Sequence, residues 1–406
     1  MLTTDSSARW ILGDRKEDAP VKCRLFLLSL VLLAAYASLT TMAWAQANHP
    51  TVQQVFVFYC TPDFLNCPNG FDPELAPVQL SNNGFVYAGT FWGGAGNSGA
   101  GGTLMLTNGV GLGSALYTFE PGQQNNFPDG SHPSVSLLRG PDGNLYGVTL
   151  SGGPSTFGVM FRMTPLGSYS VVYNFCSLPG CIDAGAPIVL AKDGNFYGVA
   201  SNVFFRITTQ GTWSQVSTLP VNLGLAARLI QGADGNFYGE GALNNSSTSS
   251  LFRITSSGQY TQLHEFDYPL FPSSPLIQAS DGYLYGATNG SGPGSGIYRL
   301  SVTGDFQFIH AMTDQEGYEP VQLLQASDGN LWGISDFRDG SFFIMTLGGT
   351  SIYSAPFNCL RTGCQPLGLM QASNGTFFGV AGQGGNTRNS NVALGTIFKI
   401  TGGLMH

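Results

Sequence analysis

Histidine and acidic side chains are the groups in this chain best suited to acid–base or metal chemistry, and the sequence contains 5 of the former and 24 of the latter. His264 and His310 occupy equivalent places in two recurring apolar segments. Repeated placement of this kind favours a structural role for both. Glu240 and Glu316 are acids that we expect in loops, with no histidine placed to join either of them in a lyase-like site.

Sequence motifs for the common catalytic and cofactor sites are missing. There is no H-E-x-x-H, no P-loop, and no G-x-S-x-G in a strand–turn–helix context. The glycine-rich run "FWGGAGNSGAGG" at 91–102 precedes no helix, so it reads as a loop rather than a phosphate cradle. Five recurring Asp residues offer one carboxylate each, whereas Ca²⁺ takes six to eight oxygens. We therefore predict no catalytic residue, no metal site and no cofactor.

The same short turn recurs seven times and defines the elements that position every other residue. Its copies start 41 to 59 residues apart and end in an aromatic residue followed by Gly or Ala. They are "NGFVYA" at 83, "DGNLYG" at 142, "DGNFYG" at 193 and 234, "DGYLYG" at 281, "DGNLWG" at 328 and "NGTFFG" at 374. A period in this range indicates a repeat architecture.

Each copy lies between short apolar segments that we expect to be strands. One segment precedes the turn, one follows it, and two more come after a Gly/Ser/Asn-rich loop, as in "LFRIT" and "YTQLHEF" at 251–255 and 260–266. Four strands per unit of this length is a propeller blade. Continuous apolar strands fit, because each blade packs between two others. The sequence predicts an all-β, seven-bladed β-propeller.

The ends of the repeat array predict how the ring closes. The last unit reaches only its third strand, "GTIFKIT" at 395–401, while "TVQQVFVFYC" at 51–60 resembles an isolated fourth strand. We expect the N-terminal strand to complete the last blade, which would leave no open end in the ring. Residues 46–406 are then a single propeller domain.

The recurring turn itself is explained by blade geometry. Asp favours a turn by bonding nearby backbone, and the Gly after it supplies the positive φ that hairpin turns require. We expect the aromatic residue two places after Asn to pack between blades and the final Gly to permit close approach of a neighbour.

At these motifs the chain resembles the GloVer (Gloeobacter/Verrucomicrobia-type) tandem repeat proteins. The resemblance rests on "DGNLYG" with the later "GTIFKIT" and "YTQLHEF" segments, and it covers roughly residues 51–401. It implies a secreted or surface protein of environmental bacteria without an established activity. The "DGNLW" element is also similar to repeats of two-component-regulator propellers and streptogramin lyases, so it indicates a propeller more strongly than a function.

The N-terminal 45 residues have the features of a secretory signal peptide. Basic residues precede a 16-residue apolar run at 25–40, and "AWA" at 43–45 is a small-x-small cleavage pattern. The run is short for a membrane span, which needs roughly 20 residues; an uncleaved anchor is the alternative. We expect export to the periplasm, outer surface or medium, with no membrane span after cleavage.

Charge limits the partners. Residues 46–406 carry 11 basic and 20 acidic side chains, a net charge of −9, which argues against nucleic acid. We expect a monomer whose partner is an extracellular glycan or protein.

The cysteines of the exported part form three close pairs. They are Cys60 with Cys67, Cys176 with Cys181, and Cys359 with Cys364, each pair in the loop that follows a fourth strand. Fifteen connectivities are possible for six cysteines, but the shared loop position favours local disulfides. Disulfides agree with export.

One face of such a propeller gathers the variable loops, and a ligand would bind there. Candidate contacts on that face are Trp92, Asp183, Tyr318, Glu319, Phe337 and Arg338. Two hypotheses remain open: a non-catalytic binding or structural propeller, and a secreted lyase or glycan-active hydrolase. Converging acids or histidines at the channel mouth would favour the enzyme, and a polar-aromatic mouth would favour binding.

Overall fold

The computed structural model describes residues 49–402 except 75, 81–84, 95–99, 123–125, 134–136, 176–186, 224–227, 244–247, 268, 291–293 and 388–391. Strands dominate this part of the chain, and Thr51–Thr401 form one compact unit. Within the described ranges there is no helix with the length and hydrophobicity that a membrane crossing requires.

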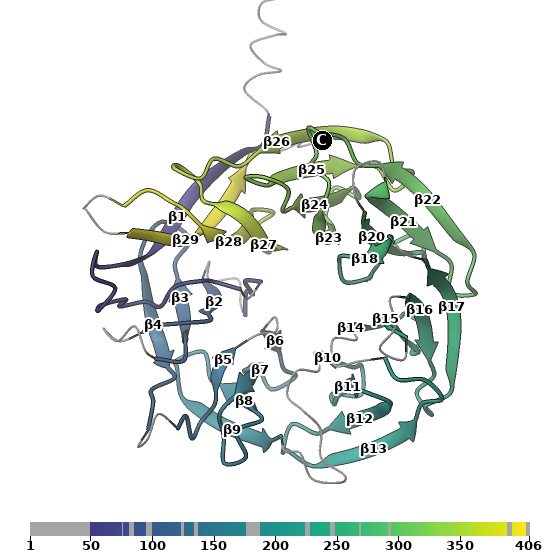
Figure 1. Cartoon of the computed structure of the whole chain (residues 1–406), viewed down its shortest axis with the longest axis horizontal. Helices are drawn as coiled ribbons and strands as arrows, with labels where there is room; N and C mark the ends of the chain where they lie inside the picture. The colour runs from purple at the N-terminus through teal and green to yellow at the C-terminus, as the bar shows by residue number, and fades with distance from the viewer. Residues whose placement is uncertain are drawn as a thin grey trace, which may run out of the picture. The chain divides into compact units, whose positions relative to one another are not determined.

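Seven antiparallel sheets form a ring, which confirms the predicted seven-bladed β-propeller (Figure 1). We number the blades in chain order. Blade 1 contains β2 (Val86–Thr90), β3 (Thr103–Thr107) and β4 (Gly113–Thr118). Its innermost strand is reduced, among the described residues, to a bridge between Val78 and Tyr87. In blades 1 to 6 the lowest-numbered strand faces the centre of the ring, and in blade 7 that strand is β27.

The next three blades repeat this order outward from the centre. Blade 2 contains β5 (Ser131–Pro133), β6 (Leu138–Arg139), β7 (Leu145–Ser151), β8 (Val159–Met163) and β9 (Tyr169–Asn174). Blade 3 contains β10 (Ile188–Leu190), β11 (Phe196–Ala200), β12 (Val203–Ile207) and β13 (Trp213–Thr218). Blade 4 contains β14 (Arg228–Gln231), β15 (Phe237–Ala242), β16 (Ser249–Ile254) and β17 (Tyr260–Phe266).

The remaining blades complete the ring. Blade 5 contains β18 (Phe271–Pro272), β19 (Ile277–Gln278), β20 (Leu284–Asn289), β21 (Gly296–Leu300) and β22 (Phe306–Ala311). Blade 6 contains β23 (Pro320–Gln325), β24 (Leu331–Ser335), β25 (Ser341–Met345) and β26 (Ser351–Pro356). Blade 7 contains β27 (Cys364–Gln371), β28 (Phe377–Gln383), β29 (Val392–Thr401) and β1 (Thr51–Cys60).

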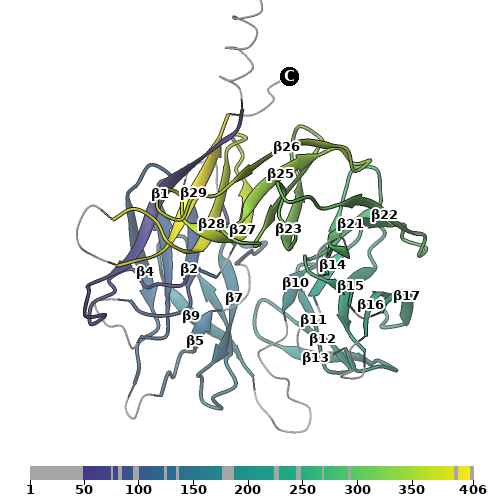
Figure 2. The same cartoon turned by 45° about the horizontal axis from the view of Figure 1, so that its top comes forward.

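The predicted ring closure is confirmed, because β1 is the outer strand of blade 7. It pairs antiparallel with β29 along its whole length, from Thr51 opposite Thr401 to Cys60 opposite Val392. The two strands lie side by side in both views (Figure 1, Figure 2). The first and last parts of the chain therefore share one sheet, which closes the ring of blades.

The recurring turn has the expected geometry and an additional contact. In blade 2, Asp142 accepts hydrogen bonds from the Asn144 backbone N–H at 3.1 Å and from the Tyr146 hydroxyl at 2.8 Å. Gly143 has a φ of +79°. The aromatic residue thus packs between blades and also fixes the turn carboxylate. The same Asp–aromatic bond recurs, at 2.6 to 3.1 Å, for Asp193 with Tyr197, Asp234 with Tyr238, Asp281 with Tyr285 and Asp328 with Trp332.

The final Gly of the turn motif provides a slot for an aromatic ring of the third strand. In blade 6, Gly333 lies opposite Phe343, and a Cβ at position 333 would clash with the tip of that ring. Blades 2, 3, 4, 5 and 7 pair a glycine with Phe or Tyr in the same way. Blade 1 has Ala88 here, and its partner is Met105, which has no ring. The glycine and the aromatic residue are one packing unit.

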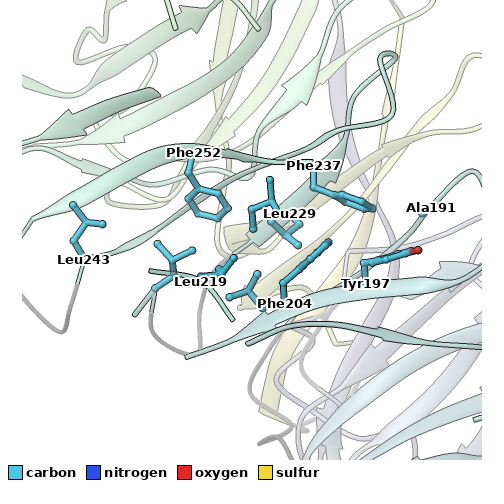
Figure 3. Packing of buried hydrophobic residues seen from close by; sticks show 11 residues of the cluster. Ala191, Tyr197, Phe204, Leu219, Leu229, Phe237, Leu243 and Phe252 are labelled. Carbon is cyan, nitrogen blue, oxygen red and sulfur yellow. The ribbon is translucent and has the colours of Figure 1, made fainter. Parts of the chain in front are cut away.

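Buried side chains between blades form the core. At the boundary of blades 3 and 4, the rings of Tyr197 and Phe204 meet Phe237 at centroid distances of 4.7 and 5.2 Å (Figure 3). Leu219 and Leu229 extend the same cluster. Because clusters of this kind fill the other boundaries too, each sheet is buried on both faces, as the continuous apolar strands predicted.

Two of the three predicted disulfides lie among the described residues, and both are confirmed. Cys60 is bonded to Cys67 and Cys359 to Cys364. Each bridge closes a loop from an outer strand to the following blade. Cys176 and Cys181 fall outside the described residues, so their pairing stays a prediction.

Candidate functional site

Four of the six candidate contacts meet on blade 6. Tyr318 and Glu319 come from the loop between β22 and β23, and Phe337 and Arg338 come from the loop between β24 and β25. Loops that enter a first strand and loops that leave a second strand emerge at the same face of a blade. We call Tyr318, Glu319, Asp336, Phe337 and Arg338 the blade 6 cluster.

Aromatic and cationic groups form one side of the blade 6 cluster. The rings of Tyr318 and Phe337 contact each other edge to face, with centroids 5.2 Å apart. The Arg338 guanidinium lies 5.1 Å from the centroid of the Phe337 ring, within the range of a cation–π contact. Arg338 is exposed, so its hydrogen-bond donors can reach a ligand.

The blade 6 cluster also contains two carboxyl groups, and one of them, Asp336, was not among the candidates from the sequence. The Asp336 backbone N–H donates to the carbonyl oxygen of Glu319 at 2.9 Å. Burial and then the nearby charge of Glu319 raise the pKa of Asp336 to about 6. Its buried Oδ1 has no hydrogen-bond partner among the described residues.

Backbone strain marks the same loop. Arg338 has a φ of +61°, in the left-handed region that residues with a Cβ seldom adopt. Such a conformation costs of order 1–3 kcal/mol and is frequent at ligand-binding positions. Such a conformation persists only where the surrounding structure enforces it.

Trp92, another candidate, belongs to a separate aromatic group on blades 1 and 2. Its ring lies 4.2 Å from that of His132, which also contacts Phe91 at 4.6 Å. His132 has a φ of +59°, shares a hydrogen bond of 2.9 Å with Ser151, and leaves a buried Nε2 without a described partner. Burial lowers the pKa of His132, which favours the neutral ring. Sequence reasoning did not assign His132 a role.

Asp183, the last of the six candidate contacts, lies outside the described residues.

Glu316 has a histidine partner, so the expectation that no histidine joins it is wrong. The Nε2 atom of His310 lies 2.9 Å from the Glu316 carboxylate, and His310 Nδ1 lies 2.9 Å from the carbonyl oxygen of Gly349. Hydroxyl groups of Thr313 and Ser351 donate to the same carboxylate at 2.8 and 2.6 Å. Because Glu316 is only 2% exposed, this network is structural, as was expected of His310.

The ionisation of this pair follows from its contacts. Burial alone would raise the pKa of Glu316, but the hydrogen bonds from His310, Ser351 and Thr313 outweigh it and hold the pKa at about 2. The hydrogen bond to Glu316 raises the pKa of His310. His264, at the equivalent place in blade 4, instead stacks on Phe306 at 3.8 Å.

Glu240 is also not the loop acid that we expected. It lies within β15 and is 6% exposed, at a position where the other six blades have Gly, Ala, Val or Ile. Burial raises the pKa of Glu240 to about 8, which the Arg228 guanidinium, 3.7 Å away, offsets only in part. A buried Tyr298 hydroxyl from blade 5 and Glu240 Oε2 both lack a described partner.

Replacing Glu240 by Val, the residue of blades 2, 3 and 7 at this position, should stabilise the fold. Removing a buried acid in favour of an apolar side chain is expected to add about 1–4 kcal/mol to the free energy of unfolding. The folded protein holds the Glu240 proton up to about pH 8, so wild-type stability falls between the ordinary Glu range and pH 8, and the variant should lack that slope. Urea unfolding at pH 5 and 8 measures both. A variant less stable than wild type at pH 8 would refute this account.

One group of three possible metal ligands occurs among the described residues: Asp339, Cys359 and Cys364. The two cysteines form a disulfide and therefore cannot bind a metal as thiolates. The carboxylate of Asp339 is therefore the one metal ligand that this group offers.

The fold and the loop-rich face define a seven-bladed β-propeller with its variable loops gathered at one end. No protein family model and no curated protein matches the chain. Virginiamycin B lyase from Staphylococcus aureus is similar in structure, with a TM-score of 0.57 and 15% identity over 87% of this chain and 99% of that one.

Sensor proteins supply the second group of similar structures. The extracellular domain of a protein described as a one component system from B. thetaiotaomicron gives a TM-score of 0.54 and 14% identity. The match covers 86% of this chain and 40% of that one. At these identities the similarity establishes the fold alone.

Proposed function

We propose that this chain is an exported, non-catalytic propeller of the GloVer type that binds a glycan at the blade 6 cluster. The observation that carries the proposal is Arg338, held in a strained backbone conformation above the Phe337 ring, in the loop that also carries the buried acid Asp336. Aromatic faces pack against the C–H faces of sugars, while guanidinium and carboxylate groups bond their hydroxyls. Export is supported by the signal-like N-terminus and the two disulfides.

A second function is favoured by a specific pair of groups. Asp336 and Glu319 are adjacent carboxyl groups of which one has a raised pKa, a pattern that glycosidases use for their general acid. A glycan-active hydrolase or lyase is therefore the alternative at the same cluster. The alternative requires a bond to be cleaved, and the binding hypothesis does not.

A glycan array probed with residues 46–406, followed by titration of the strongest hit, tests the binding site. Arg338→Asn removes the guanidinium but tolerates a positive φ, so the variant should fold and bind about tenfold more weakly or worse. Arg361→Asn, on the exposed loop of the second disulfide, is the matched control and should bind within about twofold of wild type. Equal losses in both variants, or none in either, would reject the blade 6 cluster as the site.

A further inference from the structure

A pocket lies beside the recurring turns of blades 1, 2 and 7, at the face opposite the variable loops. It has a volume of about 420 Å³. Its wall includes Val78, Gln79, Arg139, Met370, Gln371 and Ser373. These residues come from the inner parts of blades 7, 1 and 2. Small-molecule sites usually have volumes of about 300–1,000 Å³, so a single sugar ring or a small acid fits.

The repeat shows what the residue at position 139 normally does. In five blades this place, before the turn, is Gln, whose carboxamide oxygen accepts a backbone N–H of the preceding blade at 2.7–2.9 Å. The five are Gln79, Gln231, Gln278, Gln325 and Gln371. In blade 2 the segment "LRGPDG" has Arg139 where "IQGADG" of blade 4 has Gln231. Blade 2 therefore has a positively charged arginine where five other blades have the glutamine that bonds to the preceding blade.

Arg139 is not used to hold the fold together. It is exposed and makes no hydrogen bond or ion pair with the residues that the structure describes. Asp142, three residues later, is engaged by Asn144 and Tyr146 instead. Because Arg139 lines the pocket, its five N–H donors can reach a ligand there.

The other groups of the pocket suit a carboxylate on a small frame. Gln79 uses its carbonyl oxygen to accept the Ser373 backbone N–H at 2.9 Å. In blades 4 to 7 the amide of the equivalent Gln donates to a carbonyl oxygen of its own turn, and the corresponding turn of blade 1 lies outside the described residues. Val78 and Met370 add apolar wall. Guanidinium groups bind carboxylates with two parallel hydrogen bonds, which Arg139 can supply.

We propose that this pocket binds a small carboxylic acid of sugar size, with Arg139 as the anchor for its carboxylate. Two kinds of molecule carry such a carboxylate: a glycan that contains uronic acid residues, and a free sugar acid. The site is separate from the blade 6 cluster, so it does not depend on the proposed function.

Calorimetric titration with galacturonate, tri-galacturonate and neutral galactose tests the proposal. Wild-type protein should bind the two acids and not galactose, and Arg139→Gln should weaken binding at least about tenfold. This variant restores the residue of five other blades, so it should fold. Arg361→Asn, which changes an exposed arginine outside both the pocket and the blade 6 cluster, should leave acid binding unchanged.

The two acids distinguish the sources. Tighter binding of tri-galacturonate indicates a glycan, and equal binding indicates the free acid. No binding of either acid to wild-type protein at 10 mM, roughly the weakest affinity that we would regard as specific, would overturn the proposal. Equal binding by the Arg139→Gln variant would overturn it as well.

Discussion

Removal of residues 46–60 should lower the free energy of unfolding by several kcal/mol, the largest effect that we expect from any change outside the binding sites. The deletion takes away β1, which supplies the outer strand of blade 7 and buries Phe58 completely. Loss of one large buried aromatic side chain alone costs about 3–5 kcal/mol. The deletion also eliminates the disulfide of Cys60 and Cys67, and a short-loop bridge adds roughly 2–3 kcal/mol.

Cys67→Ser separates these two contributions, because it breaks the bridge and keeps the strand. We expect its unfolding temperature, followed by circular dichroism, to fall between those of the wild type and the truncated protein. A truncated protein that unfolds at the wild-type temperature would show that β1 does not close the ring in solution.

Replacement of Glu316 by Ala should cost about 3–5 kcal/mol, the amount typical of removing one partner from a buried, hydrogen-bonded pair. His310, Thr313 and Ser351 would all lose the acceptor that they share. Glu265→Ala, an exposed acid on β17, is the matched control and should change stability by less than about 0.5 kcal/mol.

The pH dependence identifies the cause. Because the folded pKa of Glu316 is about 2, its contribution is present above the ordinary Glu range and is lost as the pH falls toward 2. His310 has a raised pKa, so its share is present at low pH and is lost as the pH rises through that pKa. Urea unfolding at pH 3, 5 and 8 should show the largest difference between wild type and variant at pH 5. A difference that does not change with pH would mean that packing, and not the ion pair, is responsible.

Sequence reasoning predicted the blade number and ring closure because both follow from the repeat. Asp–Gly turns at a fixed period define the blades, and the missing fourth strand after Thr401 assigns Thr51–Cys60 to blade 7. The slot at Gly333 was predicted only as a close approach. The close neighbour is the ring of Phe343, 10 residues away in the sequence. Blade 1 has Ala88 and Met105 in place of the glycine and the aromatic residue, and this joint change was the available sign in the sequence.

The candidate sites were harder to predict, because side-chain contacts between loops have no period. Glu240 was assigned to a loop, although comparison with Val148 and Val380 would have placed it in a buried strand. The contact of His310 with Glu316 depends on how the chain folds back after β22. Asp336 directly precedes the candidates Phe337 and Arg338 in the sequence. Its raised pKa, which distinguishes it, comes from burial and the charge of Glu319 and is visible only in the structure.

Turnover of the glycan that binds the blade 6 cluster is the most direct test of a non-catalytic function. The purified domain is incubated with the array hit, and reducing ends and unsaturated products are counted over days. We predict no products above the buffer control, together with measurable binding that Arg338→Asn weakens. Steady product formation that stops in an Asp336→Asn variant would contradict this account and assign the chain to the glycan-active enzymes.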